Sequence, residues 1–384
     1  MKKKILFCCY GFGIGGIEKC MINLLNVIDT TKYEIDVLPM NPEYALLSAL
    51  HADVQMLEPF DYVMNTTDTV NAFREKKTGL FAYLKYVVFR IVNKWGHKPW
   101  RFFKAPEKHY DIAIAYAHTG YVPYYVIDCV DADRKYMWHH EGRYVKDEHY
   151  PLDQEYYPKL DAIIAVSEDD RNILIDAFPD LENKIKVLYN IVDKEEIRTK
   201  AKIPVKTEHE DAVLKITTVG RLSHQKGPDI LLDVAEKLRD SSVAFQWYWV
   251  GSGDLDEFLR NGAKERGLEN QIILMGNQNN PYPYMALCDI YVQPSYYEAF
   301  CTTTIEAQVL EKPIVVTDVC GMREQFTPGS DCIMTNVDAE DIFQAVFELA
   351  SDGEKRQQLS ANLHRKMQLD DGILQTYYDL FDQE

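Results

Sequence analysis

Short strand-like runs alternate with helical stretches along both halves of the 384-residue chain, and this alternation constrains the fold more than any other feature. Such alternation is typical of a parallel α/β sheet, because parallel strands need a long crossover connection. The runs lie at 4–10, 33–38, 53–57, 111–116, 161–166, 213–219, 245–250, 271–275, 289–293, 313–317 and 331–335. The pattern predicts two Rossmann-like domains of α/β class.

The chain is also too long for one ordinary hydrophobic core, which favours two domains. The stretch 193–211 is rich in charge and poor in apolar periodicity, so we expect a linker there. The expected domains are therefore 1–192 and 212–364, with a cleft where their sheets face each other. A last helix is expected at about 359–381, and we expect 365–384 to pack back on the first domain.

Composition excludes several classes of protein. No run of 18 apolar residues is present, and the short apolar run after Lys2 to Lys4 has no cleavage site, so neither a spanning helix nor a signal peptide is expected. The formal charge of −18 argues against nucleic acid as a partner. Eight cysteines without CxxC spacing suit reduced thiols in the cytoplasm, without zinc or disulfides.

One segment, 74–104, departs from this acidic composition with nine Lys or Arg and a single Glu. Its apolar residues, among them Leu84, Val88 and Ile91, fall near helical spacing. A basic amphipathic helix can bind an anionic membrane. The alternative is a solvated helix that packs its apolar stripe on the first domain.

A glycine turn, Gly11-x-Gly13-x-x-Gly16, follows the first expected strand. Alone, it would indicate a dinucleotide site, but the second strand ends in Leu38-Pro39-Met40-Asn41 instead of an acid, which disfavours a dehydrogenase. The remaining interpretations are a backbone turn that approaches an anionic group and a tight turn without a ligand.

The strand at 213–219 runs into a second glycine turn, from Gly220 to Gly227, which carries Arg221 and Lys226. A planar guanidinium and a point-charge ammonium suit a diphosphate that gains charge as it leaves. The order of residues is not that of a P-loop. Two solvated loop cations are the alternative.

Two carboxylates follow the strand at 289–293: Glu298 in a loop and Glu306 within a helix expected to begin near Thr302. A carboxylate can accept two sugar hydroxyls at once, and the helix start can receive phosphates. By themselves, two glutamates at this separation are commonplace.

Taken together and in order, these motifs resemble the large retaining family of GT-B glycosyltransferases over nearly the whole chain. The resemblance rests on Gly15-Gly16, Gly220-Arg221 to Lys226-Gly227, Pro281-Tyr282 before Cys288-Asp289, Glu298 to Glu306, and Lys312-Pro313 to Glu324. It implies the GT-B fold, in which two Rossmann-like domains face a central cleft.

The resemblance also implies roles for individual residues. Arg221 and Lys226 would bind the donor diphosphate, with Gly15 and Gly16 beside the donor. Glu306 would hold the ribose hydroxyls, and Glu298 would hold the transferred sugar with the backbone of Phe300, Cys301 and Thr302. Ala299 and Cys320 replace glycines of the family pattern, which would reshape the sugar pocket without removing a charged group.

The family often places a histidine of the first domain beside the donor sugar. His118 follows the strand at 111–116, and His140 follows Tyr136 to His139. Both are candidates, and a structural role is the alternative for each. The segment 138–140 resembles a subgroup that builds bacterial surface polysaccharides.

Asp131-x-Asp133 and Asp254-x-Asp256 match the DxD pattern of metal-dependent sugar transfer. Asp254 follows a glycine-rich turn at the expected N-cap of a helix, and Asp131 lies in a polar loop. Since Arg221 and Lys226 can replace a metal, we expect neither a metal nor another cofactor.

The expected function is the transfer of a hexosyl or N-acetylhexosaminyl unit, with retention, to a saccharide or lipid-linked acceptor. UDP is the expected carrier, GDP-mannose stays open, and the expected location is the cytoplasm, including its membrane face. The alternatives are a GT-B sugar nucleotide epimerase and a non-catalytic GT-B partner subunit.

Overall fold

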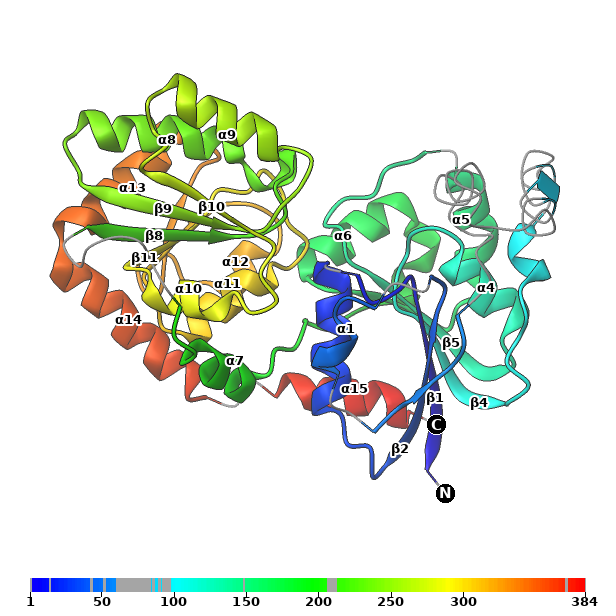
Figure 1. Cartoon of the computed structure of the whole chain (residues 1–384). Coiled ribbons are helices and arrows are strands. Elements are labelled where there is room, and N and C mark those ends of the chain that lie inside the picture. The colour runs from blue at the N-terminus through cyan, green and yellow to red at the C-terminus, as the bar shows by residue number, and fades with distance from the viewer. Residues whose placement is uncertain are drawn as a thin grey trace. The chain divides into compact units, whose positions relative to one another are not determined.

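The computed structural model describes residues 2–13, 15–41, 44–50, 53–59, 84, 87, 88, 91, 98–147, 149–205, 213–369 and 372–383. The chain forms two compact units (Figure 1). The first comprises Met1–Val166, Asp170–Tyr189 and Leu374–Glu384, and the second comprises Ser167–Asp169 and Asn190–Ile373.

The first unit is built on a seven-stranded sheet of order β3-β2-β1-β4-β5-β6-β7, in which all strand pairs are parallel. Its strands are β1 (Lys3–Cys9), β2 (Tyr33–Pro39), β3 (Gln55–Met56), β4 (Tyr110–Ala115), β5 (Ala132–His139), β6 (Ala162–Ala165) and β7 (Ile185–Val187). Its helices are α1 (Gly16–Val27), α4 (Val122–Cys129), α5 (Tyr150–Tyr156), α6 (Glu168–Ala177) and α15 (Ile373–Asp382).

The second unit is built on a six-stranded parallel sheet of order β10-β9-β8-β11-β12-β13. Its strands are β8 (Leu214–Val219), β9 (Phe245–Val250), β10 (Ile272–Gly276), β11 (Ile290–Gln293), β12 (Ile314–Thr317) and β13 (Ile333–Thr335). Its helices are α7 (Lys194–Ala201), α8 (Pro228–Asp240), α9 (Asp256–Glu265), α10 (Tyr282–Leu287), α11 (Thr302–Val309), α12 (Met322–Gln325), α13 (Ala339–Ser351) and α14 (Gly353–Met367).

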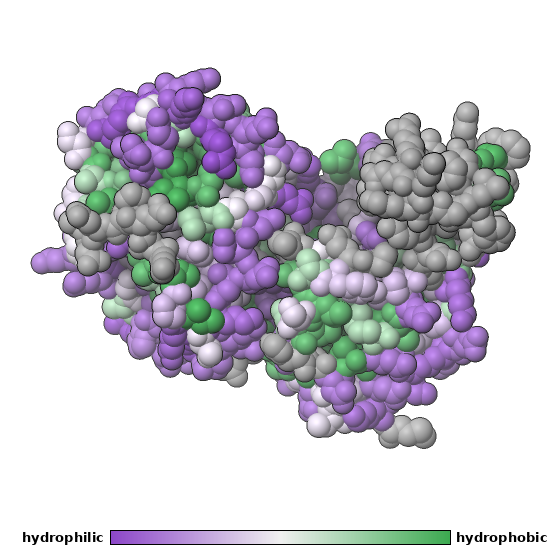
Figure 2. All heavy atoms as spheres, viewed as in Figure 1, coloured by the Kyte–Doolittle hydropathy of each residue, from purple (hydrophilic) through white to green (hydrophobic). Residues whose placement is uncertain are grey.

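Helices cover both faces of the second sheet, with α8, α9 and α13 on one face and α7, α10, α11 and α14 on the other (Figure 1). Successive strand side chains therefore enter different cores: Val315 lies in the core that contains Leu231 of α8, whereas Val316 lies in the core that contains Leu363 of α14. Burial on both faces explains why these strands are continuous apolar runs. Hydrophilic side chains predominate on the visible surface, with smaller apolar patches (Figure 2).

The prediction of two Rossmann-like α/β units is confirmed, but the sequence missed two strands. In the strand β5, Asp133, Arg134 and Lys135 interrupt the apolar pattern, and the side chains of Arg134 and Lys135 bond to backbone carbonyls. The strand β7 has three residues, which is too short for a periodic signal.

Two expectations about connections were wrong. The expected linker at 193–211 begins with the helix α7, which is capped by Asp193 and buries Ile197 in the second unit. The single helix expected at about 359–381 is two helices, α14 and α15, and only the second joins the first unit. There, Tyr377 stacks on Trp138 and Phe381 contacts Tyr33.

Most of the basic segment 74–104 lies outside the described residues. No helix in the described part of the chain combines the length and apolarity that crossing a bilayer needs.

Candidate functional site

The carboxyl end of the second sheet brings together the loops that follow β8 and β11. Gly227 has φ +68°, and a Cβ atom there would lie 2.1 Å from the carbonyl oxygen of Pro294. Gly321, with φ +72°, is equally close to the carbonyl oxygen of Ala299. Only glycine permits both this conformation and this approach, so these two positions determine how tightly the loops pack.

Side chains then fasten the loop after β8 to the loop after β11. The amide of Gln225 donates to the carbonyl of Tyr297 (3.0 Å), and the backbone N–H of Tyr296 donates to the carbonyl of Gln225 (2.8 Å). The ring of Tyr296 stacks on His224, and its hydroxyl donates to Asp229 (2.5 Å). The backbone that carries Lys226 is thereby held against the backbone that carries Glu298.

Lys226 and Glu298 form an ion pair at this position. The Nζ atom of Lys226 lies 2.5 Å from Oε1 of Glu298, and their side chains are only 15% and 6% exposed. Burial by itself lowers the pKa of Lys226, but the charge of Glu298 and the neighbouring Cys301 outweigh it and raise the pKa above its ordinary value. Lys226 is therefore a permanent cation in this site.

Arg221 stands beside this pair and is exposed, with no ion pair to any residue that the structure describes. Its positive charge acts on Lys226 and opposes the rise in pKa of that ammonium. A guanidinium that is not committed to a protein carboxylate can accept an anionic ligand as a fork of donors.

The helix α11 begins at Thr302, as the sequence predicts, with Cys301 at its N-cap. Cys301 and Thr302 are buried, Phe300 is half-buried, and burial raises the pKa of the Cys301 thiol. Glu306, one turn into α11, is fully buried, and the hydroxyl of Tyr282 lies 3.4 Å from its Oε1 atom. The second unit thus gathers Arg221, Lys226, Glu298 and the start of α11, whereas Glu306 lies deeper.

In the first unit, Gly15 is the N-cap of α1, and Gly16 is its first residue. A Cβ atom on Gly15 would lie 2.2 Å from Oε2 of Glu18, so a carboxylate already occupies the space beside this helix start. A negative side chain in the first turn stabilises a helix through its dipole, and it also opposes binding of a second anion there.

A cluster of histidines lies at the carboxyl ends of β4 and β5. The rings of His118 and His139 are 4.3 Å apart, and His140 contacts the ring of Tyr116. Burial lowers the pKa of His118, and the neighbouring His139 lowers it further; burial also holds the pKa of His140 well below its ordinary value. Both candidate histidines are therefore neutral at neutral pH.

His139, which the sequence analysis passed over, is the most firmly held member of this cluster. Its Nδ1 atom lies 2.8 Å from Oδ1 of Asp170, and both side chains are almost fully buried. The pairing joins the end of β5 to α6, across 31 positions of sequence. The His139-His140 doublet was the only signal in the sequence, and nothing there pointed to Asp170.

Neither DxD pattern has two carboxylates free for a metal ion. Asp131 and Asp133 both pair with His109, at 3.2 and 3.3 Å. The expectation that Asp254 caps a helix was wrong: α9 begins at Asp256, whose carboxylate accepts from the backbone N–H of Gly253.

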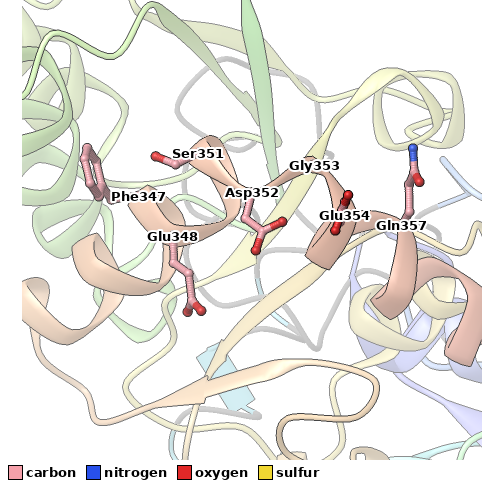
Figure 3. Close-up of a pocket in the computed structure, with 7 residues that line it drawn as sticks. All are labelled: Phe347, Glu348, Ser351, Asp352, Gly353, Glu354 and Gln357. Carbon is pink, nitrogen blue, oxygen red and sulfur yellow. The ribbon is translucent and has the colours of Figure 1, made fainter.

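A hollow of about 670 Å³ lies elsewhere, where α13 meets α14 (Figure 3). It contains none of the site residues that the sequence predicts, and its lining is Phe347, Glu348, Ser351, Asp352, Gly353, Glu354 and Gln357.

Comparison with solved structures identifies the fold. Structures that share the fold include the HepE protein of Anabaena bound to UDP and glucose (TM-score 0.72, 17% identity, 98% of this chain and 99% of that chain). A glycosyltransferase from Rickettsia africae is similar (TM-score 0.69, 15% identity, 99% and 98%). The fold is that of GT-B glycosyltransferases.

Sequence comparison finds a match to one family model in the second unit. Residues 199–366 match the model of the glycosyl transferases group 1 family. The matched segment is less than half of the chain, and it holds Arg221, Lys226, Glu298 and Glu306.

Curated relatives match about half of the chain and about half of their own length. One is the N-acetylgalactosamine-N,N'-diacetylbacillosaminyl-diphospho-undecaprenol 4-alpha-N-acetylgalactosaminyltransferase of Campylobacter jejuni, 32% identical over 52% of this chain and 53% of the relative. Another is the O-antigen chain mannosyltransferase C of Escherichia coli, 29% identical over 42% and 45%.

Proposed function

We propose that the protein is a retaining glycosyltransferase that moves a hexosyl or N-acetylhexosaminyl unit from a nucleotide diphosphate sugar, with UDP as the carrier, to a saccharide or lipid-linked acceptor. Its work would belong to bacterial surface polysaccharide synthesis. The observation that carries the proposal is the arrangement of Arg221, Lys226 and Glu298 at one end of the second sheet. The names of the Campylobacter and Escherichia relatives, which specify saccharide transfer, support it.

In this proposal, each group acts where charge or hydroxyl groups appear. Arg221 and Lys226 stabilise the departing diphosphate, Glu298 accepts a hydroxyl of the transferred sugar, and Glu306 accepts the ribose hydroxyls. The incoming hydroxyl attacks on the face of the leaving group, and a phosphate oxygen of the donor takes its proton. The protein therefore needs no covalent nucleophile. His118 or His140 would contact the donor sugar as a neutral imidazole.

The test is a panel of UDP- and GDP-linked sugars, screened by thermal shift and by release of free sugar in the absence of acceptor. A ligand at 100 times its Kd stabilises a protein by about 2.7 kcal/mol, which thermal shift detects. We expect one donor to stabilise the protein and to be hydrolysed slowly. A non-catalytic subunit would bind without hydrolysis, an epimerase would convert the donor into its epimer, and the absence of any binding would refute the proposal.

We further propose that transfer needs no metal ion. Arg221 and Lys226 supply positive charge at the site, the carboxylates of Asp131 and Asp133 pair with His109, and that of Asp256 accepts from the backbone. Activity should therefore persist in excess EDTA, measured as product formed per minute. Activity that is lost in EDTA and restored by Mg²⁺ or Mn²⁺ would contradict this.

We also propose that 74–104 binds the inner face of the cell membrane, which places a cytoplasmic enzyme next to a lipid-linked acceptor. Leu84, Val88 and Ile91 follow helical spacing and are 52%, 58% and 44% exposed, within a sequence rich in Lys and Arg. Binding to vesicles with anionic lipid should weaken as salt rises, since each cation near the surface contributes about 1 kcal/mol. Equal binding to neutral vesicles, or none, would refute the membrane role.

A further inference from the structure

A buried chain of hydrogen bonds leads from the middle of the second sheet to Glu298. The hydroxyl of Tyr291 on β11 donates to Oε1 of Gln293 (2.8 Å), and the Gln293 amide donates to the hydroxyl of Ser295 (3.0 Å). Ser295 in turn donates to Oε1 of Glu298 (2.6 Å). The exposed fraction is zero for Tyr291, Gln293 and Ser295 and 5% for Glu298.

The direction of every bond in this chain is fixed by chemistry. An ionised carboxylate only accepts, so Ser295 must donate its single proton to Glu298. The Ser295 oxygen therefore accepts from the NH₂ group of Gln293, which turns the Gln293 carbonyl toward Tyr291 and Thr303. Both of these hydroxyls donate to it, at 2.8 and 3.3 Å. No alternative orientation of Gln293 satisfies all of these partners.

The same oxygen of Glu298 also holds Lys226. Both protein donors, the Ser295 hydroxyl and the Lys226 ammonium, converge on Oε1, and neither uses Oε2. This leaves Oε2, within a side chain that is 6% exposed, as the oxygen that can accept from a ligand.

In the proposed function, two anions compete for the ammonium of Lys226: the Glu298 carboxylate and the donor diphosphate. It is paired with Glu298 here, yet the proposed function gives it to the donor diphosphate, which carries more charge than one carboxylate. When the ammonium turns toward the phosphates, Glu298 loses its strongest partner at the moment when it must hold the sugar. The hydroxyl of Ser295 is neutral, so the diphosphate does not attract it as it attracts the ammonium, and its bond to Glu298 stays.

We propose that Ser295, oriented by Gln293, is a positioning residue that keeps the Glu298 carboxylate in place for the donor sugar when the diphosphate takes over Lys226. This inference rests on the proposed function. The hydrogen bonds that link Tyr291, Gln293 and Ser295 would then contribute to sugar transfer as well as to packing, because they orient the Glu298 carboxylate that, in the proposed function, contacts the reacting sugar ring.

The experiment compares Ser295→Ala with the wild type in donor turnover and in calorimetric titration with the nucleoside diphosphate alone. We expect kcat to fall about 10-fold, which corresponds to the loss of one hydrogen bond to a charged group. The Kd of the nucleoside diphosphate should stay within about 2-fold of the wild-type value. In a Glu298→Gln background the same change should cost almost nothing, since the group that Ser295 positions is already lost. Gln293→Met, which keeps Ser295 but removes its orienting amide, should give a smaller fall.

Thr335→Val is the matched control, because it removes a buried hydroxyl of the same unit whose one bond to the described residues is to the carbonyl of Val316. It should keep wild-type kcat, and thermal unfolding checks that each variant is folded. Wild-type kcat in Ser295→Ala, an equal loss in the Glu298→Gln background, or a parallel loss of diphosphate affinity would overturn the inference alone. A wild-type protein that neither binds a nucleoside diphosphate nor releases sugar from any donor would instead refute the proposed function, and this inference with it.

Discussion

The two sheets have the same parallel construction, but their carboxyl ends carry opposite chemistry. At the end of the first sheet, His118 and His140 have lowered pKa values and stay neutral. At the end of the second, Lys226 and Glu298 form a largely buried ion pair, with the exposed Arg221 beside them. A parallel sheet places its functional groups at this end whatever their chemistry, so the fold does not decide the ligand. We therefore propose that the phosphates of the donor bind to the second unit.

The largest effect should come from the cation of the second unit. We expect Lys226→Ala to lower turnover at saturating donor by about 10² to 10³-fold, because it removes a donor where charge develops on the leaving group. Lys237→Ala is the matched control, since Lys237 forms an exposed pair with Glu340 and surface pairs contribute little. Wild-type turnover in Lys226→Ala would remove the main difference between the two sheet ends.

A smaller effect should separate the two glutamates of the second unit. Glu306→Gln should raise the Kd of the free nucleoside diphosphate by roughly 10-fold, because the ribose hydroxyls lose their hydrogen bonds to a charged acceptor. The ribose changes little during the reaction, so the effect should fall on binding. Glu298→Gln should lower turnover without weakening the nucleoside diphosphate. Glu311→Gln, which changes a partly exposed glutamate paired with His364, serves as control. Unchanged affinity in Glu306→Gln, measured by calorimetry, would reverse the assignment.

The smallest effect concerns the neutral end of the first sheet. A histidine whose pKa is lowered in the folded protein binds a proton more readily in the unfolded chain. Its contribution to the free energy of unfolding is therefore fully present above the ordinary imidazole pKa near 6.5 and is lost as pH drops below it. Each such histidine steepens the fall by up to about 1.4 kcal/mol per pH unit. We expect His118→Asn to flatten the fall between pH 6.5 and 5, measured by urea unfolding, and the exposed His364→Gln not to. An unchanged slope would mean that His118 is not buried as a neutral ring.

Much of the second unit could be predicted from sequence because its motifs are local. Gly227 and Pro228 mark the start of α8, and Thr302 marks the start of α11, each within one short segment. What the sequence could not give was partnership between segments. The ion pair of Lys226 with Glu298 joins residues 72 positions apart, and that of His139 with Asp170 joins residues in a strand and a helix that no short motif connects. The strand β5 was hidden by Arg134 and Lys135, whose charges break its apolar pattern although their backbone pairs normally.

The helix α15 makes the first unit depend on residues that the ribosome adds after the whole second unit. The buried rings of Tyr377 and Phe381 cover Trp138 and Tyr33, which are synthesised much earlier. At about 5 to 20 residues per second, the ribosome takes roughly 10 to 40 s to synthesise the second unit. During that time, the apolar surface around Trp138 and Tyr33 is exposed. The second unit ends at Ile373 and is synthesised before α15 is complete. A nascent chain should therefore complete the second unit before the first. Chaperone contact during synthesis would then concentrate on the surface that α15 later covers.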